Sequence, residues 1–192
     1  MFIIISSPSG GGKNTIIREL LKIYPQSFLF ITTTTREARE KEKNNKDYYF
    51  ISKKEFEKKI KSDDFVEYNF YNDNYYGIDK IKMEKIRQKK SMIFFAIDVN
   101  GKKSFDKKKI EHFSIFILPE SLAILEERIR QRGSISESQI KDRLKLAKKE
   151  LKIAQNYDYK IVNKQGKLDE TVKKIKKIID KILAKELGLD KS

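Results

Sequence analysis

Short apolar segments alternate with amphipathic ones along most of the chain. Residues Phe2–Ser6 are apolar and mostly β-branched, and apolar side chains then recur at helical spacing from Ile16 to Tyr24. Four later apolar runs lack the strict alternation of a half-exposed strand, as expected for strands that are covered on both faces. These runs are Phe28–Thr32, Met92–Ile97, Ser114–Leu118 and Tyr159–Val162.

Amphipathic segments with helical periodicity separate these predicted strands. The clearest are Ser121–Gln131, Ser136–Gln155 and Leu168–Leu187. A regular succession of strand and helix favours parallel strands joined by crossover helices. The pattern therefore predicts an α/β fold with a parallel sheet covered by helices.

The segment Arg36–Asp79 departs from this succession. It contains an aromatic run at Tyr48–Ile51 and another at Phe65–Tyr71. Between them, Ser52 with Glu55 three residues later has the spacing of a capping box at the start of a helix. We interpret the segment as a small mixed α/β insertion.

Composition narrows the possible chemistry. The chain has no cysteine and a single histidine, His112, so disulfides, cysteine-based zinc sites, iron–sulfur clusters and thiol nucleophiles are excluded. No apolar run approaches the roughly 20 residues of a membrane-spanning helix, and the first residues lack the basic region of a signal peptide. We therefore expect a soluble, cytoplasmic protein without a membrane partner.

The formal charge of +15 points to an anionic partner, such as a nucleotide, a nucleic acid or a membrane surface. Only eight of the 43 basic residues are arginines, so this chain uses lysine wherever a general positive charge suffices. We interpret the lysine-rich patches at Lys102–Lys109 and Lys173–Lys177 as solvated helix faces. No helix-turn-helix, zinc-finger or RNA-recognition signature accompanies the charge, which disfavours nucleic-acid binding.

The residues Ser7–Asn14 read S-P-S-G-G-G-K-N and stand between the first predicted strand and the first predicted helix. Glycine tolerates the positive φ angles and the close approach that let successive N–H groups converge on a phosphate. The helix N-terminus adds a partial positive charge, and Lys13 adds a full one. Three glycines alone would also fit an ordinary turn, but strand, glycines, lysine and helix together favour a phosphate-binding loop.

Two positions depart from the general pattern G-x-x-x-x-G-K-[S/T]. Ser7 replaces the first glycine, which is a change between small residues. Asn14 replaces the hydroxyl residue that ligates Mg²⁺ in this pattern, and Thr15 lies one position out of register. An asparagine carbonyl oxygen can ligate a hard cation, although Mg²⁺ demands nearly octahedral geometry. Asn14 is therefore the candidate metal ligand.

Several motifs in succession resemble those of guanylate kinase. They are S-S-P-S-G-G-G-K from Ser6, T-T-T-T-R-E-A-R-E-K-E from Thr32, D-Y-Y-F from Asp47, Y-Y-G from Tyr75 and R-I-R-Q-R-G from Arg128. The similarity covers nearly the whole chain in the order and spacing of that family. It implies a kinase of purine nucleotide metabolism that transfers the γ-phosphate of ATP to GMP, with Mg²⁺ as the cofactor.

The resemblance implies a site for the GMP phosphate formed by guanidinium groups, which bind oxygens bidentately, and by tyrosine hydroxyls. The residues at the matching positions are Arg36, Arg39, Tyr48 and Tyr76. Core packing is the alternative role for the two tyrosines.

For the guanine base, the family pattern gives Thr32, Glu67 and Asp98. A carboxylate at Glu67 can accept from both N1–H and the 2-amino group of guanine, which adenine does not offer in that arrangement. Thr32 can donate to O6, and Asp98 can accept from the amino group. Ile78 stands where the family commonly has a hydroxyl residue, so we expect one base contact to be missing.

For ATP, the resemblance implies binding by the glycine loop and by a residue near the adenine at the end of the last strand. This set is Ser9, Gly10, Gly11, Gly12, Lys13, Asn14, Thr15 and Asn163. Arg128, Arg132 and Arg143 align with arginines that close on the phosphates and act with the loop lysine in catalysis. Arg130 lies on a different helix face, and we interpret it as a surface residue.

The resemblance also implies three structural parts. They are a core of residues 1–31, 80–127 and 148–192, a GMP-binding insertion at 32–79 and a helical lid at 128–147. At position 96 the family typically carries an aspartate, and this chain has Ala96. Because Asn14 and Ala96 both weaken the metal site, we expect weaker Mg²⁺ dependence or slower turnover, and not a different reaction.

A catalytically weak module that holds a nucleotide or a phosphorylated partner is the main alternative. The residues Asn14 and Ala96 favour such a module. The complete GMP set and the lid arginines oppose it, and they favour an active phosphotransferase.

Overall fold

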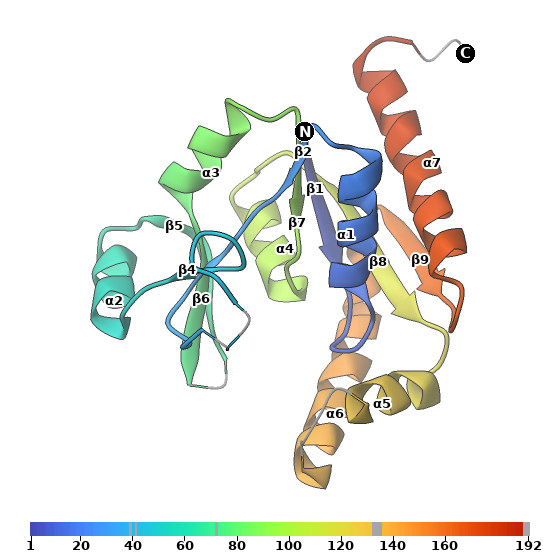
Figure 1. The fold of residues 1–192 in the computed structure, drawn as a ribbon, viewed down its shortest axis with the longest axis horizontal. Coiled ribbons are helices and arrows are strands. Elements are labelled where there is room, and N and C mark those ends of the chain that lie inside the picture. Colours follow the sequence, from blue (N-terminus) through green and yellow to red (C-terminus); the bar gives the residue numbers. More distant parts are fainter. Residues whose placement is uncertain (39, 41, 72, 132–135, 190–192) are drawn as a thin grey trace. The chain divides into compact units, whose positions relative to one another are not determined.

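The structure is a computed structural model that describes residues 1–38, 40, 42–71, 73–131 and 136–189 (Figure 1). The chain divides into two compact units. The first unit comprises Met1–Ile4 and Pro25–Phe113, and the second comprises Ile5–Tyr24 and Ser114–Ser192. This division has other boundaries than the predicted core, insertion and lid, and those three parts stay a prediction.

Parallel strands form the first sheet of the first unit. Strand β7 (Met92–Phe95) pairs in parallel with β1 (Phe2–Ser6) on one side and with β2 (Ser27–Leu29) on the other. Every residue of β1 and of β7 is buried. Complete burial explains why these segments read as continuous apolar runs without alternation, and it confirms the predicted α/β class.

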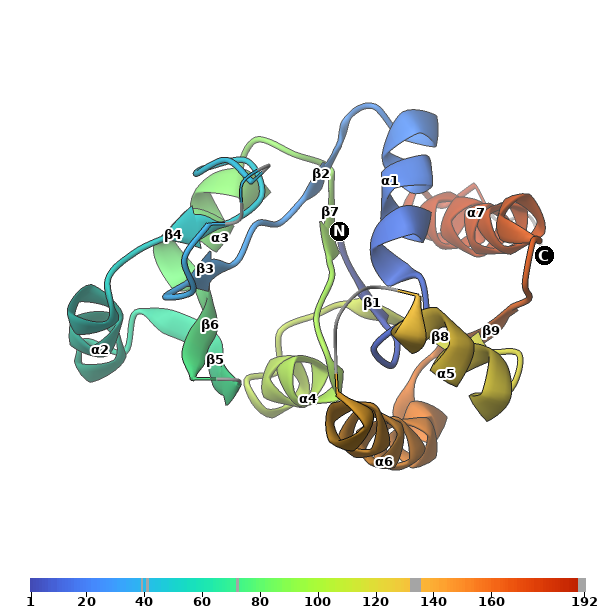
Figure 2. The ribbon, with the colours of Figure 1, turned by 60° about the horizontal axis from the view of Figure 1, so that its bottom comes forward.

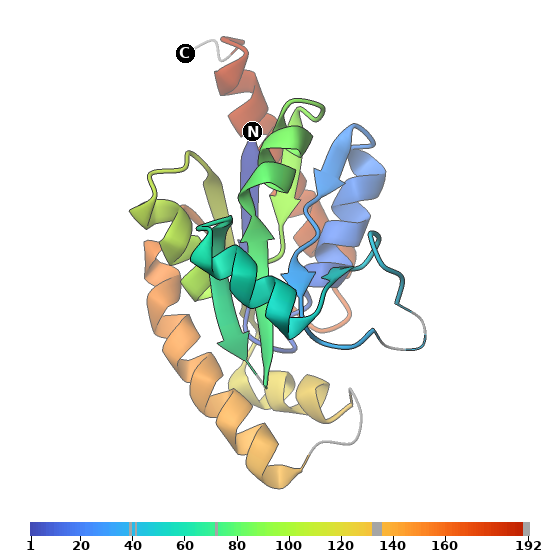
Figure 3. The same ribbon diagram turned by 90° about the vertical axis from the view of Figure 1, so that its left-hand side faces the viewer.

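A second, four-stranded sheet in the first unit has the strand order β4-β3-β6-β5. Its strands are β3 (Thr33–Thr34), β4 (Tyr49–Phe50), β5 (Phe65–Tyr71) and β6 (Asn74–Asp79). Strands β5 and β6 form an antiparallel hairpin, and helix α2 (Lys53–Lys61) lies beside it (Figure 3). Ser52 caps α2 by accepting a hydrogen bond from the N–H of Glu55, as the sequence predicts.

An aromatic cluster joins α2 to one face of the hairpin. The ring of Phe56 is fully buried and stacks on Phe65 and Tyr75, with centroid distances of 4.3 and 5.1 Å. A register shift between Phe65 and Glu67 rotates the strand, so that Phe65 and Tyr68 both face Phe56. Truncating Phe56 to alanine would cost about 3–5 kcal/mol of stability.

Two further helices complete the first unit, α3 (Lys80–Arg87) and α4 (Val99–Lys107). Each begins at an aspartate whose carboxylate accepts one or two backbone N–H groups of the first turn. Asp79 caps α3 and Asp98 caps α4. The negative charge of an aspartate at this position also interacts favourably with the positive end of the helix dipole.

In the second unit, β8 (Phe113–Pro119) pairs in parallel with β9 (Tyr159–Asn163). Helices α1 (Lys13–Ile23) and α7 (Leu168–Glu186) lie side by side (Figure 2). The Tyr24 hydroxyl, just after α1, donates a 2.7 Å hydrogen bond to Asp180 of α7. The two helices are thus joined by a polar contact as well as by packing.

Helices α5 (Leu122–Arg130) and α6 (Glu137–Ile153) pack through an apolar cluster in the same unit. The cluster consists of Leu125, Ile129, Ile140 and Ala147. The exposed Arg130 pairs with Glu126 of its own helix and with Glu137 of α6, which agrees with its interpretation as a surface residue. None of the helices in the described part of the chain has the length and apolar character to span a bilayer.

Candidate active site

The glycine loop between β1 and α1 needs each of its glycines for a physical reason. Gly10 and Gly12 have φ angles of +89° and +94°, which side-chain-bearing residues rarely adopt. A Cβ on Gly11 would lie 2.6 Å from the Cβ of Ser7, which is closer than atoms can approach. The curled backbone and the start of α1 form the geometry of a phosphate-binding loop.

The buried side chain of Asn163 ties this loop to the end of β9. Its Nδ2 donates to the carbonyl oxygen of Gly11 at 3.1 Å, and its Oδ1 accepts from the Thr171 hydroxyl at 3.1 Å. Both ends of the amide are therefore bonded within the protein. The side chain fixes the curvature of the loop, whereas its predicted place near the adenine stays a prediction.

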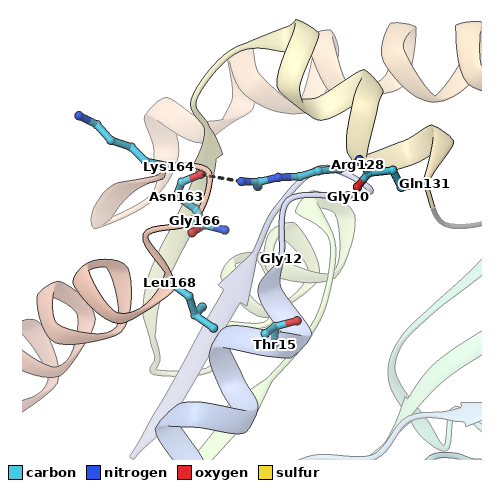
Figure 4. A pocket seen from close by; sticks show the side chains of 9 residues that line it. All are labelled: Gly10, Gly12, Thr15, Arg128, Gln131, Asn163, Lys164, Gly166 and Leu168. Carbon is cyan, nitrogen blue, oxygen red and sulfur yellow. Dashed lines mark hydrogen bonds between the residues drawn. The ribbon is translucent and has the colours of Figure 1, made fainter.

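A cavity of about 480 Å³ opens beside the loop (Figure 4). Its lining consists of Gly10, Gly12, Thr15, Arg128, Gln131, Asn163, Lys164, Gly166 and Leu168. The Arg128 guanidinium donates to the carbonyl oxygen of Asn163 and to Oε1 of Gln165, each at 3.3 Å. The volume is in the range of small-molecule pockets, and a cationic group lines it.

The other predicted ATP residues lie on the same unit. Lys13 is the first residue of α1 and is partly buried, while Asn14 and Thr15 are exposed on its first turn. Arg143 is partly buried on α6. Arg132 lies outside the described residues.

In the first unit, three of the predicted phosphate ligands come together. The guanidinium carbon of Arg36 lies 5.3 Å from the centre of the Tyr48 ring, and the Tyr48 and Tyr76 ring centres are 6.3 Å apart. Stacking of this kind holds a guanidinium in place while leaving its edges for hydrogen bonds. Arg39, the fourth predicted ligand, lies outside the described residues.

Glu42 holds one edge of Arg36. The Nη2 of Arg36 donates to both carboxylate oxygens of Glu42, at 2.9 and 2.7 Å. Burial alone would lower the pKa of Arg36, but the hydrogen bonds and the charge of Glu42 outweigh it and raise that pKa. The guanidinium is therefore held as a fixed cation.

Two of the three residues predicted for the base, Glu67 and Asp98, lie near each other in the first unit. Asp98 accepts the N–H groups of Asn100 and Gly101 with Oδ1, each at 2.9 Å. Burial, and secondly the negative charge of Asp98, raise the pKa of Glu67 to about 8. The two carboxylates thus lie close together in a partly buried environment. Thr32 lies directly before β3, in the sheet that also contains Glu67. Ile78 is fully buried, and the expected loss of a base contact there stays a prediction.

Sequence reasoning missed three residues that position the acceptor residues. Thr34 accepts the N–H of Arg36 and donates to the Tyr75 carbonyl, so it sets the start of the arginine loop. Glu42 anchors Arg36, and Asn69 lies beside Asp98, with its Nδ2 3.5 Å from Oδ2 of the carboxylate. The run of four threonines was a signal for Thr34. No local pattern in the sequence indicates Glu42 or Asn69.

The described residues offer a metal ion few ligands. Among them, no group of three or more His, Cys, Asp or Glu side chains could hold a metal ion. Asn14, the candidate ligand, is neutral and lies on an exposed turn, and the side chain of Ala96 has no oxygen. This donor set fits a Mg²⁺ ion that phosphates and water hold, and not one enclosed by side chains.

Known proteins resemble this chain over most of its length. The guanylate kinase family profile matches residues 1–182. A guanylate kinase from Rickettsia felis is 42% identical over 179 residues, covering 93% of this chain and 92% of that protein. One from Clostridium tetani is 41% identical over 180 residues, covering 93% and 85%.

Solved structures also resemble this chain. The crystal structure of guanylate kinase from Anaplasma phagocytophilum has a TM-score of 0.70 and 29% identity, covering 94% of this chain and 84% of that one. Shikimate kinase from Acinetobacter baumannii shares the fold alone, with a TM-score of 0.52, 14% identity, and 93% and 92% coverage. From the family profile and these relatives it follows that the chain belongs to the guanylate kinase family of nucleoside monophosphate kinases.

Proposed function

We propose that this chain transfers the γ-phosphoryl group of ATP to GMP, with the residues described above in specific roles. The observation that supports it most is the composition of the first unit's polar site. Two carboxylates suited to the donors of guanine occur in the same unit as a stacked arginine and two tyrosines suited to a phosphate. One hairpin, β5 and β6, carries both Glu67 and Tyr76.

On the acceptor side, Arg36, Tyr48 and Tyr76 bind the GMP phosphate, and Arg39 adds a second guanidinium. Glu67 accepts N1–H and one amino proton of guanine, Asp98 accepts from the amino group, and Thr32 donates to O6. Adenine presents an acceptor at N1 in place of the donor, so it offers no proton to an ionised Glu67. This mismatch gives the preference for guanine.

On the donor side, Ser9, Gly10, Gly11, Gly12, Lys13, Asn14 and Thr15 surround the ATP phosphates, and Asn163 lies near the adenine. An oxygen of the GMP phosphate attacks the γ-phosphorus, and the bond to the bridging oxygen breaks to release ADP. Lys13, Arg128, Arg132 and Arg143 offset the charge on the transferring group and exclude water. The protein contributes alignment and charge, and no covalent step of its own.

Mg²⁺ accompanies ATP in this proposal. When bound, it neutralises charge on the β- and γ-phosphates. Asn14 is the residue of this chain that would contact it, through its side-chain oxygen.

The same proposal keeps the three predicted parts, with a core at 1–31, 80–127 and 148–192, an acceptor insertion at 32–79 and a lid at 128–147. It places the protein in the cytoplasm, in purine nucleotide metabolism, with ATP and GMP as partners and neither nucleic acid nor membrane.

An ADP-release assay with GMP, AMP, CMP and UMP as acceptors, at several Mg²⁺ concentrations, tests the proposal. We expect turnover with GMP and little with the other three. Tight GMP binding without turnover of any acceptor would instead favour the binding-module alternative. A strong response to AMP would contradict the role given to Glu67.

A further inference from the structure

The face of the β5–β6 hairpin that bears Glu67 carries a second polar side chain. Residues two apart on a strand share a face, so Glu67 and Asn69 point to the same side of β5. Asn69 is the direct partner of Tyr76 across the hairpin, and directly opposed residues also share a face. Asn69 therefore lies next to predicted base and phosphate ligands, on the side away from the aromatic cluster at Phe56.

The side chain of Asn69 reaches the other carboxylate of the site. Its Nδ2 lies 3.5 Å from Oδ2 of Asp98, a long contact that a small movement would shorten. The Oδ1 of Asp98 already accepts two backbone N–H groups at the start of α4. One oxygen of Asp98 is thus committed to the helix, and the oxygen available for a base is the one that Asn69 approaches.

A hydrogen-bond donor beside Glu67 and Asp98 would offset the repulsion between the two carboxylates. Glu67 and Asp98 are both acceptors when ionised, and their charges oppose each other. At Ile78, the direct partner of Glu67 across the hairpin, the side chain is apolar and fully buried, so it supplies no donor to this face. An amide at Asn69 supplies N–H groups without adding charge.

We propose that Asn69 is a specificity-determining residue of this site: it orients Oδ2 of Asp98 toward the 2-amino group of guanine and thereby increases the preference for GMP over IMP. IMP carries the same phosphate and the same N1–H but lacks the 2-amino group. Interactions through Asp98 are therefore realised with GMP alone. The inference rests on the proposed function, because it assumes that GMP occupies this site.

The test is the ratio of dissociation constants for IMP and GMP, measured by calorimetry on the full chain. For Asn69→Ala we expect GMP binding to weaken about five-fold, as for the loss of one hydrogen bond of ordinary strength, while IMP binding stays constant. The ratio of the IMP to the GMP dissociation constant therefore falls, because only the GMP constant rises. A variant that merely loosened the hairpin would weaken both ligands alike and leave the ratio unchanged, which would overturn the inference.

Two further variants test whether Asn69 acts through Asp98. Asn100→Ala removes an exposed asparagine next to Asp98 but keeps the backbone N–H that Asp98 accepts, so the IMP-to-GMP ratio should equal that of the unaltered chain. In a double-mutant cycle, Asn69→Ala should have no effect on the ratio once Asp98 is changed to Asn. An equal effect of Asn69→Ala in both backgrounds would show that it does not act through Asp98.

The failure of this inference can be told apart from failure of the proposed function. If the unaltered chain neither binds nor phosphorylates GMP, the proposed function is wrong and this inference falls with it. If GMP is bound and phosphorylated but the ratio does not respond to Asn69→Ala, the function stands and the role of Asn69 is wrong.

Discussion

Glu67 should make the protein less stable than a neutral residue at the same place. Its carboxyl is largely desolvated and faces Asp98, which raises its pKa from 4.5 to about 8. Each pKa unit corresponds to about 1.4 kcal/mol, so ionised Glu67 would cost up to about 5 kcal/mol. Water at the partly exposed carboxyl reduces that ceiling, and we expect Glu67→Gln to gain about 2 kcal/mol of stability at high pH.

The pH dependence follows from the direction of the shift. Between pH 4.5 and about 8 the unfolded chain has released the Glu67 proton while the folded chain retains it. The free energy of unfolding contributed by this group is therefore fully present at low pH, falls as pH rises through that window and levels off above it. The Glu67→Gln variant does not lose this stability, so the difference in free energy of unfolding between the variant and the parent chain should grow from about pH 5 to about pH 9.

Urea unfolding at a series of pH values, without nucleotide, measures this advantage. Glu111→Gln, at an exposed glutamate, controls for the loss of one negative charge. Adding GMP should reverse the order, because binding stabilises the parent chain and glutamine cannot accept both guanine donors. A Glu67→Gln variant no more stable than the parent at about pH 9 would refute the reasoning.

Three further changes test the site. Asn14→Thr combined with Ala96→Asp should raise turnover and steepen the Mg²⁺ titration, and unchanged titration curves would contradict the view that this chain holds the metal weakly. Glu42→Ala should raise the KM for GMP about ten-fold by releasing Arg36, whereas a lower KM would mean that Glu42 competes with the phosphate. Asn163→Ala removes two buried hydrogen bonds and should cost about 2–3 kcal/mol in unfolding experiments, with the KM for ATP rising and the KM for GMP constant.

The strands and helices that carry local signals were predictable. Phe2–Ser6 has the bounds read from the sequence, because a buried strand needs a run of apolar side chains and this segment supplies one. The aromatic run at Phe65–Tyr71 coincides with β5, because aromatic and β-branched side chains favour strands. Strand β6 was not predicted, since Asn74–Asp79 shows neither alternation nor an apolar run. It is stabilised by pairing with β5 and β3 and not by its own composition.

The predicted strand at Phe28–Thr32 differs from the observed one for a topological reason. Strand β2 ends at Leu29, and Thr33–Thr34 belong to a different sheet as β3. An apolar run cannot indicate that the chain leaves one sheet for another within a few residues. The ion pair of Arg36 with Glu42 depends on the shape of the loop between them, which the spacing of the two residues in the sequence does not indicate either.

The capping of α4 by Asp98 gives the protein a built-in spectroscopic probe. Its Oδ1 accepts the amide protons of Asn100 and Gly101, while its Oδ2 makes a long contact of 3.5 Å with the Nδ2 of Asn69. A base amino group arriving at Oδ2 would draw charge from Oδ1 and weaken both cap hydrogen bonds. The two amide resonances would then report by nuclear magnetic resonance whether GMP is bound beside Asp98, with no label attached to either nucleotide.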